Sequence, residues 1–212
     1  MKAVVLGATG ATGKALIQAL LADERFDTVI ALTRRPFFAP HAKLKEVIVD
    51  FTSPDIFNDA FQEADIAYSC MGTTLKDAGS KEAHWRVDYD YQLNFAAYCR
   101  NIGVSCFVLL SAIGSKATSP FFYSRMKGEL DHMVRGLGFP KLRIVQPAAI
   151  LRPESTRAVE VFMGKASAAF SKIGLFRDYA PISTTDLAKV LIHISLVESP
   201  GVLIWKRKDF IF

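Results

Sequence analysis

Residues 3–16 read AVVLGATGATGKAL, a short apolar run that is followed by Gly7, Gly10 and Gly13 and then by the start of an amphipathic helix. The order of strand, glycine loop and helix predicts a βα turn in this stretch. In such a turn Gly7 permits the tight reversal out of the strand and Gly13 lets the helix pack close to the sheet. Gly10 keeps the outer side of the loop free of side chains.

The same loop predicts a binding site for a dinucleotide. Free N–H groups at the start of the helix bind pyrophosphate oxygens, and a residue without a side chain lets the ligand come close. Glycine-rich loops also occur without any ligand, so the prediction depends on the strand before the loop and the helix after it. The residues expected to contact the pyrophosphate are Gly7, Thr9, Gly10, Ala11, Thr12 and Gly13.

Strand-like apolar runs alternate with helix-like segments over most of the chain. Continuous apolar strands joined by helices predict an α/β fold whose parallel sheet is buried on both faces. The expected strands are residues 3–6, 28–33, 46–51, 65–70, 105–111, 142–146 and 202–205. The expected helices are residues 13–22, 55–63, 80–101, 121–137, 155–173 and 184–197.

The 212 residues predict one domain, with residues 1–147 as the cofactor-binding core and residues 148–212 as a small segment that covers the substrate and closes the sheet. The net charge of +5 permits anionic ligands, but the basic residues are scattered and no nucleic-acid motif is present, so no nucleic-acid partner is expected. No apolar run approaches the roughly 18 residues of a membrane span. The histidines are far apart, so no metal site is expected. The three cysteines have no CxxC spacing, and together with the missing span this predicts a cytoplasmic protein.

Three polar residues are candidates for catalysis. Tyr123 and Lys127 form a Y-x-x-x-K pair on the helix expected after the fifth strand, and Ser111 ends that strand. Open parallel sheets bind ligands at the carboxyl ends of their strands, so these side chains should meet the dinucleotide. The Lys127 ammonium, on the same helix face, should lower the pKa of the Tyr123 phenol from about 10. Tyr123 would then act as general acid or base, with Ser111 bonded to the reacting carbonyl. The alternative is a tyrosine packed on the sheet and a solvated lysine.

In order and spacing, GATGATG at 7–13, Ser111 and YSRMK at 123–127 resemble the short-chain dehydrogenase/reductase family. The chain is more closely similar to the atypical branch of that family which contains the Tat-interactive tumour suppressor. This similarity rests on TRRP at 33–36, VDF at 49–51, CMGTT at 70–74, VDYDY at 87–91 and LLSAIGS at 109–115. The resemblance implies a doubly wound, mostly parallel Rossmann sheet with helices on both faces and a small C-terminal substrate-covering region. It also implies bound NADP(H), with Tyr123 and Lys127 in contact with the nicotinamide ribose.

The chain departs from the family pattern in two places. The family has an asparagine on the helix before the fifth strand, and here Asp88 and Asn94 are both candidates for that position. The C-terminal region is shorter than in the large epimerase-type members, which argues against sugar-nucleotide chemistry.

The turn after the second strand predicts NADP(H) in preference to NAD(H). An NAD site places Asp or Glu there, about 20 residues past the loop, to bind the ribose 2′-hydroxyl. Here the strand runs into Arg34 and Arg35, and a guanidinium suits a 2′-phosphate. Two exposed arginines without a ligand are the alternative interpretation.

Further cofactor contacts are expected where neighbouring strands end. Asp50 and Phe51 would border the adenine, and Gly72 with Thr73 the adenosine ribose. Pro147 resembles the family's residue beside the nicotinamide amide.

Two functions remain open from the sequence. One is an NADP(H)-dependent reductase of a small carbonyl or quinone, with Ser111, Tyr123 and Lys127 as its catalytic residues. The other is a cofactor-sensing regulator whose occupancy orders residues 148–182 and changes its affinity for a protein partner. Neither the substrate nor the oligomeric state follows from the sequence.

Overall fold

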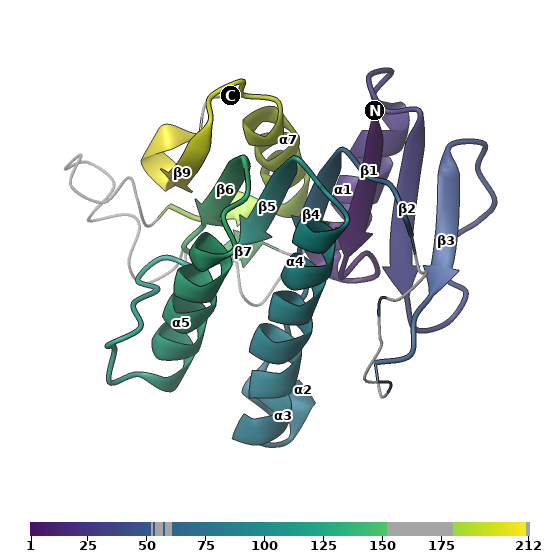
Figure 1. Ribbon diagram of the computed structural model, residues 1–212. Coiled ribbons are helices and arrows are strands. Elements are labelled where there is room, and N and C mark those ends of the chain that lie inside the picture. The colour runs from purple at the N-terminus through teal and green to yellow at the C-terminus, as the bar shows by residue number, and fades with distance from the viewer. Residues whose placement is uncertain (52, 54–56, 58–60, 152–179, 211–212) are drawn as a thin grey trace.

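Figure 1 shows the computed structural model, which describes residues 1–51, 53, 57, 61–151 and 180–210. Its centre is a seven-stranded sheet of order β3-β2-β1-β4-β5-β6-β9 in which every neighbouring pair is parallel. The strands are β1 (Lys2–Leu6), β2 (Thr28–Thr33), β3 (Leu44–Ile48), β4 (Ile66–Ser69), β5 (Cys106–Leu110), β6 (Lys141–Gln146) and β9 (Gly201–Lys206). The predicted doubly wound parallel sheet is confirmed.

Helices cover both faces of the sheet, as predicted. Figure 1 shows α1 (Ala11–Ala22) and α7 (Thr184–Ser195) behind it and α4 (Tyr91–Asn101) and α5 (Phe122–Gly136) in front. Side chains alternate between the faces along each strand. On β1, Ala3 and Val5 pack in the core of α1 and α7, whereas Val4 and Leu6 pack in the core of α4 and α5. Burial on both faces explains why these strands read as unbroken apolar runs.

The segment between β4 and α4 consists of short helical pieces. Here α2 (Leu75–Ala78) and α3 (Lys81–Trp85) begin at Thr74 and Ser80, whose hydroxyls accept hydrogen bonds from the N–H groups of Asp77 and Ala83. A π-helical turn, η1 (Arg86–Asp90), then leads into α4. The helix predicted at 80–101 therefore contains a π turn, and that turn carries Asp88, whose side chain is buried.

Other elements differ from the sequence prediction. The third strand ends at Ile48, so Asp50 and Phe51 lie in the turn beyond it and not on it. A two-residue parallel pair, β7 (Ile150–Leu151) with β8 (Ile182–Ser183), was not expected. The predicted helix at 155–173 lies outside the described residues, as does most of the one at 55–63, of which residues 61–63 are not helical. The division into a cofactor-binding core and a covering segment stays a prediction.

A buried arginine ties the last helix to the last strand. Arg143 on β6 is fully buried and donates hydrogen bonds to the carbonyl oxygens of Ile194 (3.1 Å), Val197 (2.8 Å), Gly201 (3.0 Å) and Ser199. These carbonyls belong to the end of α7, the turn after it and the start of β9. Arg143 therefore ties the C-terminal end of α7 and the turn after it to the start of β9, and it fixes the edge strand.

Candidate cofactor and catalytic site

Two of the three loop glycines are required by packing within the protein. Gly7 has a φ of +79°, and a Cβ there would lie 2.6 Å from the backbone nitrogen of Met71. A Cβ on Gly13 would lie 2.1 Å from the carbonyl oxygen of Gly7. Side chains at these positions would push the loop away from β4 or the helix away from the loop.

Gly10 is different, because the fold crowds this position less than the other two. Its φ is −73°, which any residue can adopt, and a Cβ would meet one neighbouring atom within 4 Å, the Gly7 oxygen at 3.3 Å. Gly10 is the N-cap of α1 and supplies no side-chain cap, so the first-turn N–H groups of the helix are left for a ligand. This arrangement fits the pyrophosphate of a dinucleotide.

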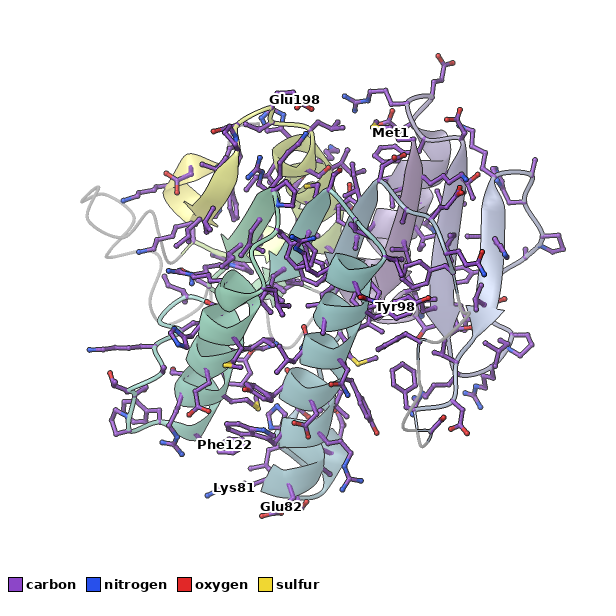
Figure 2. The ribbon with its side chains drawn as sticks, viewed as in Figure 1. Met1, Lys81, Glu82, Tyr98, Phe122 and Glu198 are labelled. Atoms are coloured by element: carbon purple, nitrogen blue, oxygen red, sulfur yellow. The ribbon has the colours of Figure 1, made fainter. Side chains whose placement is uncertain are left out.

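A cavity of about 770 Å³ lies beside this loop, at the carboxyl ends of β1, β2 and β4. The strand order reverses between β1 and β4, which is where doubly wound sheets bind their ligands. Figure 2 shows Lys81, Glu82 and Phe122 at this end of the molecule and Met1 and Glu198 at the opposite end. A second hollow of about 440 Å³ at the amino ends is lined by residues such as Lys2 and Glu63, which pair with each other.

The cavity brings together most of the predicted cofactor residues. Those that line it are Gly7, Thr9, Gly10, Arg34, Asp50, Phe51, Gly72 and Thr73. Those that do not line it are Ala11, Thr12, Gly13, Arg35, Tyr123, Lys127 and Pro147. Sequence reasoning missed the wall made by α2, α3, η1 and α4, which consists of Asp77, Ala78, Ala83, Val87 and Tyr91. Irregular short helices carry no periodic signal, and VDYDY at 87–91, which contains Val87 and Tyr91, indicated the family but no cavity contact.

A carboxylate on the neighbouring strand contacts the turn that carries Arg34. Glu46 on β3 accepts hydrogen bonds from the Thr33 hydroxyl (2.9 Å) and from the backbone N–H groups of Phe37 (2.9 Å) and Phe38 (3.4 Å). The turn itself carries no carboxylate, as the sequence indicated, but one from the neighbouring strand contacts it. Pairing of β3 with β2 brings Glu46 there from outside the turn. Its oxygens fold the turn and are already engaged by three donors.

Lys127 and Asp88 form a buried ion pair. Lys127 Nζ lies 3.1 Å from Asp88 Oδ1, and the two side chains are 3% and 1% exposed. The other carboxylate oxygen accepts a hydrogen bond of 2.7 Å from the backbone N–H of Thr73, in the cavity wall. Asn94, the other candidate for the family's asparagine position, is exposed on α4. The structure therefore places Asp88, not Asn94, beside the lysine.

Tyr123, Lys127 and Asp131 follow one another by one turn each on the same face of α5. Tyr123 remains 43% exposed, so a ligand can reach it. Burial raises the pKa of its phenol, Lys127 opposes this, and the charges of Asp88 and Asp131 raise the pKa further. The expectation that Lys127 lowers this pKa was right about the influence of the lysine and wrong about the net direction. The main reason is the burial of the phenol, and the charges of Asp88 and Asp131 add to it.

Ser111 follows β5 directly and is 5% exposed. Its hydroxyl lies 3.0 Å from that of Ser115, and within the described residues it makes no hydrogen bond to Tyr123 or Lys127. The loop after it is held by a hydrogen bond of 2.9 Å from the N–H of Ile113 to the carbonyl of Pro147. The predicted residues Ser111 and Pro147 are thus neighbours across β5 and β6.

Gly128 allows the loop after Ser111 to pack directly against α5. A Cβ on Gly128 would lie 2.2 Å from the carbonyl carbon of Lys116 and 2.3 Å from the nitrogen of Ala117. The N–H of Lys116 also donates to the carbonyl of Ser124, at 3.0 Å. This close approach brings the connection between Ser111 and Tyr123 against the helix. Sequence reasoning missed Gly128, which the motif YSRMKG contains.

The described residues contain neither a candidate metal cluster nor a helix that could span a membrane. No cluster of three or more His, Cys, Asp or Glu side chains there could hold a metal ion. Over the same part of the chain, no helix has both the length and the apolar character that crossing a bilayer requires.

A family model described as NAD(P)H-binding matches residues 7–195, from the first loop glycine to the end of α7. The chain belongs to this NAD(P)H-binding family. Within it the protein is of the atypical short-chain dehydrogenase/reductase type, as the motifs predicted. The family explains why the glycine loop, the cavity and the strand reversal coincide.

Curated relatives of this NAD(P)H-binding protein come from fungi and mammals. "Protein FMP52, mitochondrial" of Candida albicans is 32% identical over 204 residues, which are 92% of this chain and 88% of that protein. "Protein HTATIP2" of Rattus norvegicus is 36% identical over 150 residues, which are 69% of this chain and 62% of that protein.

Solved structures share the fold at low sequence identity. The structure of MoeE5 in complex with UDP-glucose and NAD superposes with a TM-score of 0.73 at 15% identity, over 97% of this chain and 76% of that one. A short chain dehydrogenase family protein from Francisella tularensis has a TM-score of 0.67 at 15% identity, over 96% and 95% of the two chains.

Proposed function

We propose that this protein is an NADP(H)-dependent oxidoreductase that reduces a small carbonyl compound or a quinone. The observation that carries the proposal is the buried pair of Lys127 and Asp88. It lies one helical turn from Tyr123 and is joined through the N–H of Thr73 to the wall of the cavity. A buried ion pair is weak evidence for stability, so its place beside a tyrosine and a ligand cavity points to chemistry.

Each of the site residues would have its own role in the reaction. The bound dinucleotide would supply the hydride. Tyr123, whose raised pKa keeps the phenol protonated at neutral pH, would donate a proton to the carbonyl oxygen of the substrate. Ser111 would hydrogen-bond the same oxygen. Lys127, held in place by Asp88, would bind the nicotinamide ribose. The raised pKa keeps the phenol in the protonated form that reduction requires, whereas oxidation would require the deprotonated form.

The preference for NADP(H) is part of the proposal. Arg34 borders the cavity, while the nearby Glu46 already accepts three hydrogen bonds from the turn. A carboxylate engaged in this way is poorly placed to bind a ribose 2′-hydroxyl. The guanidinium of Arg34 would instead pair with a 2′-phosphate through charge-assisted hydrogen bonds.

The test is oxidation of NADPH by the purified protein with a panel of aldehydes, ketones and quinones. We expect turnover with at least one of these classes, and its loss in Tyr123→Phe. The control is Tyr89→Phe, which removes a phenol hydroxyl from η1 outside the cavity lining. Equal turnover in the parent and in Tyr123→Phe would contradict the proposed role of the phenol.

One observation favours a second function. The raised pKa makes the phenol of Tyr123 a weaker proton donor than the lowered pKa that the motif predicted. The alternative is a regulator that binds NADP(H) and, when occupied, changes its affinity for a protein partner. Tight NADPH binding without turnover of any panel member would favour it.

We propose a cytoplasmic location on the sequence evidence, whereas the fungal relatives are named mitochondrial, and cell fractionation distinguishes the two.

A further inference from the structure

His84 is a buried side chain that the proposed reaction does not use. It lies on α3 and is 4% exposed. Its ring stacks on that of Tyr123, with centroids 6.0 Å apart and planes at 30°, and also contacts Phe122 at 5.7 Å. Its Nε2 lies 3.5 Å from Asp88 Oδ2. His84 therefore touches both the phenol ring and the carboxylate that holds Lys127.

Neither ring nitrogen of His84 has a hydrogen-bond partner among the described residues. Buried polar atoms in folded proteins nearly always have one, so an unpaired imidazole beside a carboxylate calls for an explanation. The distance of 3.5 Å to Asp88 is slightly longer than a hydrogen bond of about 2.7–3.2 Å, and a small rotation of either side chain would close it.

We propose that His84 is a positioning residue of this site. Its ring supports the phenol of Tyr123, and its Nε2–H donates to Asp88 and so fixes the carboxylate that holds Lys127. The catalytic meaning of this role rests on the proposed function. Its effect on the phenol, however, can be measured without cofactor or substrate.

The nitrogen and the ring can be tested separately. His84→Phe keeps an aromatic ring and loses both nitrogens, whereas His84→Gln keeps an N–H donor and loses the ring. NMR titration of the phenol carbon, assigned by comparison with Tyr123→Phe, measures the pKa of Tyr123 in each variant. His193→Phe is the control, because this histidine contacts Trp205 instead.

We expect His84→Phe to raise the pKa of Tyr123 by about 0.3–1 unit, because Asp88 then loses a donor and its charge acts more strongly on the phenol. His84→Gln should shift this pKa by less than half as much, and its Tyr123 ring signals should broaden because the stacking is lost. Titration of His84→Phe at the parent pKa would overturn the role of the nitrogen. Unchanged titration and unchanged ring signals in both variants would overturn the whole proposal.

A measurement on the unmodified protein guards against variants that fail to fold. The imidazole nitrogens of His84 can be identified through contacts of its ring protons with Tyr123. We expect the proton on Nε2, and its absence from that nitrogen would overturn the proposal. The two proposals fail separately. Absence of turnover with the expected titration contradicts the enzyme alone, whereas turnover with parent-like titration of both variants contradicts the role of His84 alone.

Discussion

Asp88 Oδ1 and Lys127 Nζ lie 3.1 Å apart in a place where both side chains are almost completely buried. Asp88 comes from η1, which precedes β5 in the chain, and Lys127 from α5, which follows it. The carboxylate of Asp88 also accepts a hydrogen bond from the N–H of Thr73 at the cavity wall. The lysine is therefore paired within the protein itself. This pairing reduces the influence of its charge on the phenol of Tyr123, whose pKa is raised.

Replacing Asp88 by asparagine should lower the pKa of Tyr123. The substitution removes a charge that raises this pKa and leaves Asp131 as the remaining carboxylate that opposes the charge of Lys127. Because Tyr123 must be protonated to act as an acid, reduction is lost as the pH rises through the pKa of the phenol. The basic limb of the rate profile should therefore move to lower pH, by about 1 unit, in Asp88→Asn. A limb that stays in place or moves to higher pH would show that Asp88 does not act on the phenol.

Tyr123→Phe should reduce turnover by about 10²–10⁴ and change the free energy of NADPH binding by less than about 1 kcal/mol. The hydroxyl acts in the transition state, whereas in the bound complex it makes one ribose hydrogen bond at most. Lys127→Ala should weaken both turnover and binding, because it also leaves Asp88 buried without its partner. Stopped-flow measurement of hydride transfer and calorimetry separate the two effects. A Tyr123→Phe variant within threefold of the parent rate would rule out the phenol as the acid.

Arg34→Ala should weaken NADPH binding by about 1.5–3 kcal/mol and leave NADH binding almost unchanged, since only NADPH carries the 2′-phosphate. Arg35→Ala is the matched control, because Arg35 is next to it in the chain but does not line the cavity. Calorimetric titration with both cofactors gives the comparison. Equal losses for NADPH and NADH would refute the assignment, and a larger loss in Arg35→Ala would transfer it to the neighbouring residue.

The loop glycines should separate binding from folding. Gly10→Val should abolish dinucleotide binding at a small cost in stability, because its Cβ would meet the Gly7 oxygen at 3.3 Å, whereas the side chain would stand where the pyrophosphate approaches. Gly13→Ala should destabilise the protein by about 3 kcal/mol, because its Cβ would collide with the Gly7 carbonyl. Urea unfolding and NADPH titration of both variants provide the measurements. Parent-like NADPH affinity in Gly10→Val would mean that this loop is not the cofactor site.

Arg143→Met should lower the free energy of unfolding by about 2–4 kcal/mol while NADPH affinity stays the same. The substitution leaves the carbonyls of Ile194, Val197 and Gly201 without their buried donor, far from the cofactor cavity. Arg135→Met, at an exposed position on α5, is the control and should change stability by less than about 0.5 kcal/mol. A small effect at Arg143 would show that water replaces the guanidinium at these carbonyls.

The sequence by itself determined the fold class and the general position of the candidate site. Spacing of glycines and alternation of apolar runs are local signals, because a βα turn and a buried parallel strand each impose their residue types over a few neighbouring positions. For this reason the loop from Gly7 to Gly13, the order of strands and helices, and the Tyr123 and Lys127 pair could all be predicted without coordinates.

Only the tertiary structure decided the polar contacts of the site. Asp88 and not Asn94 pairs with Lys127, because Asp88 lies buried on the π turn. Glu46 contacts the turn that carries Arg34 because β3 pairs with β2. The direction of the pKa shift at Tyr123 depends on burial and on charges from η1 and α5 together. These contacts and this pKa shift depend on residues that are far apart in the chain, so no local spacing encodes them. They are set only when the completed fold brings those residues together.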